Sequence, residues 1–138
     1  MNFNLIPGID SSSSGIEAQR KRMEAAASNM ANADTTIDKN GNGYRPLRVE
    51  MKPSFQDELN GETSTVKSEM VPMNDEIVEE YAPEHPNADE NGMIRKPKVS
   101  PIREMMDMIS ATRSYEANLS VMRQSKDMAE ATIARLKG

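Results

Sequence analysis

The C-terminal third of the chain carries one long amphipathic pattern. Ser100 can cap a helix, and Pro101 suits the first helical position, where a missing N–H costs nothing. No glycine or proline follows until Gly138, and largely apolar side chains recur at alternating spacings of three and four residues. The series runs through Met105, Met108, Thr112, Tyr115, Leu119, Met122, Ala129, Ile133 and Leu136, and Lys126 interrupts it. This spacing predicts one long helix over residues 100–138, whose narrow apolar seam needs a partner helix.

The N-terminal segment shows the same alternation and supplies that partner. Small residues within it would allow a close helix approach, and the full series is Leu5, Ile9, Ser12, Ile16, Gln19, Met23, Ala26, Met30 and Ala33. Four of these recur every seven residues, as along one edge of a heptad seam: Ile9, Ile16, Met23 and Met30. The pattern predicts a helix within residues 1–34 that begins near Asp10 or Ser14 and ends near residues 32–34. We expect the two terminal helices to form an antiparallel coiled coil, with further neighbours along both seams.

Residues 35–80 are expected to form a loop and a small β-containing insertion. Residues 48–51 and 65–71 alternate partly with period two, which predicts short strands, and residues 60–62 read as a turn between them. Proline cannot donate to a strand ladder, so such strands are restricted to short edge positions by Pro46, Pro53 and Pro72.

Residues 81–99 contain three prolines and Gly92, which preclude a continuous helix. We therefore predict an extended Pro-rich arm with fixed bends that leads back to the C-terminal helix. The expected fold is mainly α, with long N- and C-terminal helices, a small β-containing insertion and this arm. Its parts are the helical core segments 1–34 and 100–138, the insertion 35–80 and the arm 81–99.

The amino-acid composition does not favour a large globular core. Hydrophobic residues make up 36% and aromatic residues 4% of the chain, and tryptophan is absent, so we expect a thin core and a stability that depends on other subunits. Cysteine is absent, which excludes disulfides and thiolate metal sites. Residues 50–90 hold twelve acids and two bases, an unfavourable balance for nucleic-acid binding. No apolar run reaches the roughly 20 residues that cross a bilayer, and residues 1–10 lack the features of a secretory signal.

Candidate chemical sites are weak in this sequence. Asp38, Asn40 and Asn42 occupy ligand positions of an EF-hand loop, but Val49 stands where a bidentate glutamate is needed, so an Asn-Gly turn is favoured over a calcium-responsive module. His85 is the only histidine and is read as a packing or turn residue, with a metal site as the alternative. Phosphate-binding glycine motifs are missing. We expect no enzyme activity and no cofactor.

Several separate motifs together resemble the bacterial flagellar basal-body rod proteins, in particular the proximal-rod members. The stretch ASNMANAD at residues 27–34 resembles the signature near the family's N-terminus, and MMDMISATRSYEAN at residues 105–118 resembles its C-terminal helix signature. The matching residues are Asn29, Asn32, Tyr44, Arg45, Tyr81, Pro83, His85, Pro86, Asp89, Gly92, Arg113 and Asn118. Three positions depart from the arm pattern: Glu84, Met93 and Lys98.

The resemblance implies a structural role in the proximal rod of the flagellum. Rod proteins are exported without a cleaved signal peptide through the flagellar type III apparatus, and their terminal helices order on assembly into a hollow shaft between membrane ring and hook. Expected partners are other copies of the chain, other rod proteins and a membrane-ring or adaptor protein at the rod base. We expect no nucleic-acid partner and no direct insertion into the membrane. A free coiled-coil adaptor or export chaperone of the flagellar system is the alternative.

Overall fold

The computed structural model describes residues 7–37, 41–54, 65–73 and 77–137. Within these residues, two helices and four strands follow in the order α1 (Pro7–Ala31), β1 (Leu47–Pro53), β2 (Val66–Pro72), β3 (Ile77–Tyr81), β4 (Met93–Pro97) and α3 (Pro101–Lys137). The strands form two small antiparallel sheets, β1–β2 and β3–β4. The chain is thus mainly α-helical with a small β-containing insertion, as the sequence predicts.

The helix boundaries agree closely with the sequence signals at three of four ends. Helix α3 begins at Pro101, and the Glu104 N–H donates to the Ser100 carbonyl at 3.0 Å. Helix α1 ends at Ala31, where both the backbone N–H and the side-chain amide of Asn32 donate to the Ser28 carbonyl. The start of α1 differs from the prediction, because the helix already begins at Pro7, a residue that suits a first helical turn.

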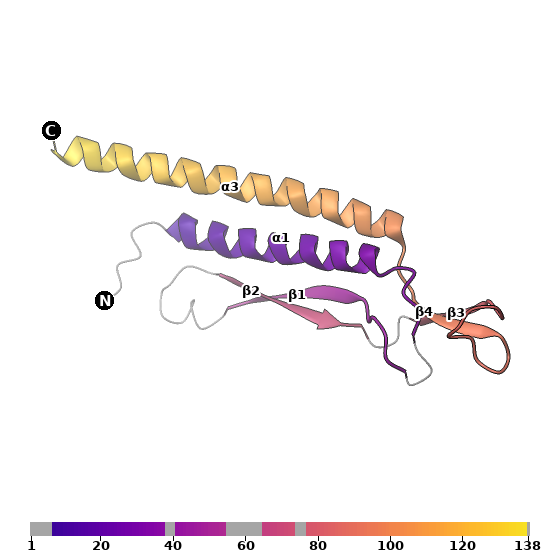
Figure 1. Cartoon of the computed structure of the whole chain (residues 1–138). Coiled ribbons are helices and arrows are strands. Elements are labelled where there is room, and N and C mark those ends of the chain that lie inside the picture. Colours follow the sequence, from indigo (N-terminus) through magenta and orange to yellow (C-terminus); the bar gives the residue numbers. More distant parts are fainter. Residues whose placement is uncertain (1–6, 38–40, 55–64, 74–76, 138) are drawn as a thin grey trace.

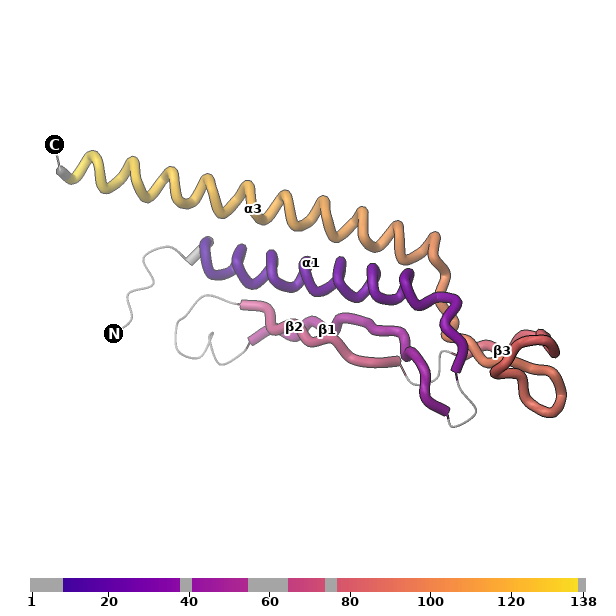
Figure 2. The backbone as a smooth tube through the Cα atoms, viewed as in Figure 1, coloured from indigo at the N-terminus to yellow at the C-terminus, as the bar shows by residue number. Residues whose placement is uncertain are grey.

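Helix α1 is the middle layer of the molecule. It lies between α3 on one side and the β1–β2 hairpin on the other, and α1 and α3 run in opposite directions (Figures 1 and 2). The contact between Gly15 and Asn118 and the hydrogen bond between Asn29 and Glu104 set the register of the two helices. By this register Pro7 lies opposite about residue 126, so the last turns of α3 extend beyond the start of α1.

The β1–β2 hairpin confirms both predicted strands. Its register pairs Leu47 with Pro72 and Pro53 with Val66, so prolines stand at the strand ends, where a missing N–H does least harm. The turn expected at residues 60–62 lies outside the described residues. The hairpin packs on α1 through Lys21, whose Nζ donates to the Ser68 carbonyl at 2.6 Å.

Residues 81–99 differ from the expected extended arm. Strand β4 pairs antiparallel with β3, from Ile77↔Pro97 to Tyr81↔Met93, so much of the segment is one half of a β-hairpin. The chain can reverse because Gly92 adopts a positive φ of 75°, which side chains disfavour. An isolated bridge from Ile37 to Arg95 ties this hairpin to the loop after α1.

The interior is lined by small side chains. Among the described residues the buried apolar side chains are Ala18, Ala25, Ala26, Ile37, Ile94 and Ala111, and Pro46 is the largest that is fully buried. Many larger apolar side chains, most of them on α3, are exposed instead. No helix in the described part of the chain is both long and apolar enough to cross a membrane.

Candidate assembly surfaces

The interface between α1 and α3 follows a stripe that overlaps only partly with the predicted seam. Of the predicted series, Met108, Tyr115, Leu119 and Met122 on α3 are half-buried, and so are Ile9, Ile16, Met23 and Met30 on α1. The most buried α3 positions, however, are Ala111 and Ser125, which the predicted series omits. Small residues occupy these positions because α1 itself presents Ser12, Ala18, Ala25 and Ala26 and approaches closely.

Four residues of the predicted seam are exposed. Met105 lies at or beyond the flank of the interface, whereas Thr112 still contacts α1, because its hydroxyl donates to Met23 Sδ at 3.3 Å. Ile133 and Leu136 lie on the part of α3 that extends beyond α1 (Figure 1). Leu136 is 82% exposed. We call residues 127–137 of α3 the overhang. Its apolar side chains would need a second molecule to cover them.

A second apolar stripe lies on the opposite side of α3. Ile102, Met105, Met106 and Ile109 are all more than half exposed, and Ile102 reaches 76%. At roughly 100° of rotation per residue, this stripe points away from Ala111 and hence away from α1. We call these four residues the outer face. Its spacing of i, i+3, i+4, i+7 is a helical signal that the sequence already contains.

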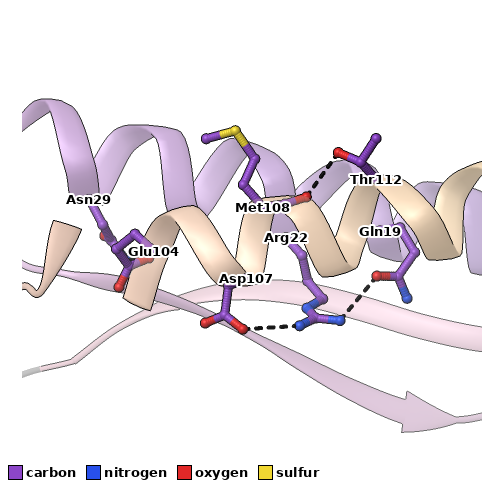
Figure 3. Close-up of polar contacts among 7 residues, drawn as sticks. All are labelled: Gln19, Arg22, Asn29, Glu104, Asp107, Met108 and Thr112. Carbon is purple, nitrogen blue, oxygen red and sulfur yellow. Dashed lines mark hydrogen bonds and ion pairs between the residues drawn. The ribbon is translucent and has the colours of Figure 1, made fainter. Parts of the chain in front are cut away.

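Polar contacts fix the register of the two helices (Figure 3). Arg22 is central, since it donates through Nη1 to Gln19 Oε1 at 3.1 Å and lies 3.5 Å from Asp107 Oδ1 through Nη2. The Thr112 hydroxyl donates to the Met108 carbonyl at 2.9 Å, a local bond within α3. Because Arg22 and Asp107 are partly exposed, this ion pair specifies register more than it stabilises the fold.

Asn29 joins three parts of the fold through four hydrogen bonds. Its Nδ2 donates to the Leu47 carbonyl at 2.9 Å and to Glu104 Oε2 at 3.1 Å. Its Oδ1 accepts from the Leu47 N–H and from the Tyr44 hydroxyl, both at 2.7 Å. The residue is only 2% exposed, so each bond replaces one that water no longer supplies. This cluster, which we call the asparagine joint, couples α1, the start of β1 and the start of α3.

The other residues that match the family signatures either make contacts within the chain or lie on its surface. Asn32 closes the end of α1, and Asn118 faces Gly15, where an added Cβ would lie 2.8 Å from its Nδ2. Asn118 thus marks a point of close helix approach. Arg45 and Arg113 are exposed.

The remaining matched residues gather at the end of the β3–β4 hairpin. A Cβ on Gly92 would lie 3.0 Å from both Tyr81 and Pro83, so glycine is needed there for space as well as for its φ. The Asp89 carboxylate accepts from the N–H groups of Asn91 and Met93, at 2.8 and 2.9 Å. The hairpin end is therefore held in one shape by its own hydrogen bonds.

His85 is a turn residue, as the sequence predicts. Its Nδ1 accepts from the Asn87 N–H at 3.1 Å, and its own N–H donates to the Ala82 carbonyl, while the neighbouring Pro86 is exposed. Asn87 also donates to the Thr36 hydroxyl at 2.7 Å, which ties the hairpin end to the loop after α1.

Two ion pairs shift the pKa values of surface groups. Lys96 Nζ lies 2.6 Å from Glu80 and 3.7 Å from Asp34, and the hydrogen bond that Lys96 donates to Glu80 raises the pKa of Lys96 above its ordinary value. Arg48 lies 2.7 Å from Glu50, and this hydrogen bond lowers the pKa of the Glu50 carboxyl. Both pairs belong to hairpins and each has at least one well-exposed partner, so they orient side chains without creating reactive groups.

The described residues contain no cluster of three or more His, Cys, Asp or Glu side chains that could hold a metal ion. Asp38 and Asn40 of the EF-hand-like loop lie outside the described residues. Val49, the twelfth position of that loop, lies in strand β1, whereas an EF-hand requires an exiting helix.

Comparisons with known proteins match both helical ends of the chain. Residues 9–36 match the family model described as flagella basal body rod protein. Residues 90–136 match the model described as the C-terminal part of flagellar basal body rod FlgEFG proteins. These ranges cover most of α1, strand β4 and nearly all of α3, and they include Asn29 and Glu104 of the asparagine joint.

Curated relatives extend the match to nearly the whole chain. The flagellar basal-body rod protein FlgC of Agrobacterium fabrum is 41% identical over 90% of this chain and 89% of the relative. FlgC of Bacillus subtilis is 38% identical over 87% of this chain and 90% of the relative, and FlgC of Aquifex aeolicus is 39% identical over 98% and 99%. The chain therefore belongs to the FlgC family of flagellar basal-body rod proteins, and it is a structural rod subunit, not an enzyme.

Proposed function

We propose that this chain forms part of the proximal rod and packs through its terminal helices into the wall of a hollow drive shaft between membrane ring and hook. The observation that carries this proposal is the placement of apolar side chains. The outer face and the overhang expose large residues, whereas the interior holds mainly small ones. Fully covering one such side chain contributes about 1.5–3 kcal/mol, which can offset the ordering of a subunit on assembly.

We propose that the layers of the fold have different roles in the assembly. Residues 1–34 and 100–138 would form the helical core that pairs as an antiparallel coiled coil and contacts neighbouring subunits. Residues 35–80 and 81–99 would lie outside this core and brace it through the asparagine joint. Close-packed helices resist shear, which suits a part that transmits torque.

The assembly residues belong to two proposed classes. Met23, Met30, Met108, Tyr115, Leu119 and Met122 would hold α1 and α3 together and fill the edges of the pair. Ile102, Met105, Met106, Ile109, Ile133 and Leu136 would contact neighbouring subunits directly. This division rests on the difference in exposure between the two sets.

The proposed partners are other copies of the chain, other rod proteins, a ring or adaptor protein at the rod base and the flagellar type III export apparatus. A core of small side chains supports export of an unfolded chain, because little buried apolar area must be exposed before passage. Stability would then come mainly from the assembled rod.

Isolation of detergent-extracted basal bodies, followed by mass spectrometry of their subunits, tests the location. We expect the chain to remain after hook and filament are removed. A free coiled-coil adaptor or export chaperone, the competing function, would stay in the cytosol and be absent from these particles. Assembly through the helices is tested by Leu119→Asp, which we expect to abolish motility while soluble expression persists. Normal motility in this variant would count against the proposal.

A further inference from the structure

A groove of about 540 Å³ opens between α1, β1, residues 98–100 and the first turns of α3. Apolar residues line part of it, namely Ala25, Ala26, Leu47, Val49 and Val99, and we call the two buried alanines its floor. Ala25 and Ala26 are buried beneath it, so larger side chains of a second molecule could enter without displacing any of this chain. The asparagine joint forms one wall and keeps the groove in a fixed shape.

The rim of the groove has a surplus of positive charge. Four bases line it, Arg22, Arg48, Lys98 and Arg103, against two acids, Glu104 and Asp107. Both acids already have partners, since Glu104 accepts from Asn29 and Asp107 lies beside Arg22.

Arg103 is the base that the fold leaves available. Its side chain is exposed, and it has no ion-pair or hydrogen-bond partner among the residues that the structure describes. A guanidinium can bind a carboxylate through two parallel hydrogen bonds, which gives such a contact both strength and orientation. An apolar floor of fixed shape beside an available guanidinium can bind a segment that carries acidic residues and at least one apolar side chain.

We propose that this groove receives an acidic segment of an adjoining rod subunit, with a carboxylate on Arg103 and an apolar side chain on the alanine floor. The inference deepens the proposed function and rests on it. A subunit of this fold has such a segment to offer: the β3–β4 hairpin end exposes Glu84, Asp89 and Glu90 beside an exposed Tyr81. Its internal hydrogen bonds hold it in one shape, which lowers the entropy cost of binding.

Carbodiimide coupling in isolated basal bodies tests the proposal directly, because this reagent joins an amine to a carboxylate only when the two are in contact. Arg103→Lys keeps the charge and places an amine on the rim. Arg123→Lys is the matched control, since Arg123 is also exposed on α3 but does not line the groove. We expect the new amine at position 103 to be joined to an Asp or Glu of a neighbouring subunit, identified by peptide mapping, with at least a tenfold excess over position 123.

Coupling confined to the chain's own Glu104 or Asp107, or equal yields at the two positions, would overturn the proposal while the rod assignment stands. Absence of the chain from basal bodies would instead contradict the proposed function. If the coupled residue lies in the hairpin end of a second copy, the occupant is the same protein; if it lies in another rod protein, that protein supplies the acidic segment. Both results support the groove.

Charge reversal gives an independent measurement. We expect Arg103→Glu to lower the number of copies incorporated into basal bodies roughly tenfold, because it opposes one carboxylate with another. Arg123→Glu should leave incorporation unchanged, and both purified variants should melt at the temperature of the parent chain. Equal incorporation of the two variants would overturn the proposal.

Discussion

The two sides of α3 differ in a way that inverts the usual distribution of apolar residues. The side that α1 covers has Ala111 and Ser125 at its most buried positions. The opposite side, the outer face, exposes Ile102 and Met106 among its larger residues. In a self-sufficient globular domain the large side chains lie inside, because burial of their area supplies most of the stability.

The two sides of α3 therefore have different roles. Small residues let α1 and α3 approach closely and set their register, but they bury little area. Large residues outside retain their area for contacts with other molecules, and exposed apolar patches of this kind mark interaction surfaces. One side of α3 therefore packs on α1 and sets the shape of the chain. By our proposal, the outer face on the opposite side contacts neighbouring subunits and stabilises the chain in the assembly.

The largest expected effect comes from placing a charge on the outer face or the overhang. Ile109→Asp or Ile133→Asp should abolish motility, because a carboxylate would have to be buried between subunits. The free chain should keep its stability to within about 0.5 kcal/mol, since both positions are half exposed. Motility assays and thermal melts of the purified variants measure the two quantities. Loss of folding in the free chain would contradict the assignment of these residues to contacts between subunits.

Removal of the asparagine joint should have the next largest effect. Asn29→Ala leaves the Leu47 N–H without its side-chain acceptor and the Leu47 carbonyl without its side-chain donor, which should cost about 3 kcal/mol. Urea unfolding measures this loss, and hydrogen exchange at the Leu47 amide should accelerate. Tyr44→Phe serves as the graded control and should cost less, because it removes the hydroxyl's bonds to Asn29 and Ser28 but keeps both bonds between Asn29 and Leu47. If Asn29→Ala is as stable as the parent, the joint does not hold the layers together.

Overpacking of the inner side should destabilise the free chain by a smaller amount. Ala111 is fully buried, so Ala111→Leu forces α1 and α3 apart at a cost of about 2 kcal/mol. The matched control is Met105→Leu on the outer face, which conserves volume and should leave the melting temperature unchanged. Equal effects at the two positions would mean that the helices do not pack through the stripe at Ala111.

The smallest expected effect concerns the hairpin that braces the helices. The pKa of Lys96 is raised above its ordinary 10.5 by Glu80, so the pair stabilises the fold fully below that pH and loses its contribution as pH rises through the shifted value. Lys96→Met should therefore differ slightly from the parent at pH 7 and match it at strongly alkaline pH. Because both carboxylates are well exposed, added salt should shrink the difference at pH 7. A difference that grows with pH would contradict this account.

The sequence by itself determined both helices, two of the four described strands and the family. Period-two segments predicted β1 and β2, the three-four alternation predicted both helices, and Ser100, Pro101 and Asn32 located their ends, because periodicity and end chemistry are local properties. It also contained the second stripe, at Ile102 to Ile109, which a search for one seam passes over. The early start of α1 at Pro7 agrees with the preference of proline for the first helical turn, a local signal that the expected start at Asp10 or Ser14 passed over.

Only the tertiary structure decided which stripe faces inward. Alternating spacing cannot rank Met105 against Ala111, because the choice depends on how closely α1 approaches, and that depends on alanines in a different segment of the chain. The β3–β4 pairing depends likewise on Ile37 and Asp34, which lie more than 40 residues away. Contacts between distant segments leave no periodic trace in a sequence, so the exposure of the outer face, the asparagine joint and the groove became visible only in the folded chain.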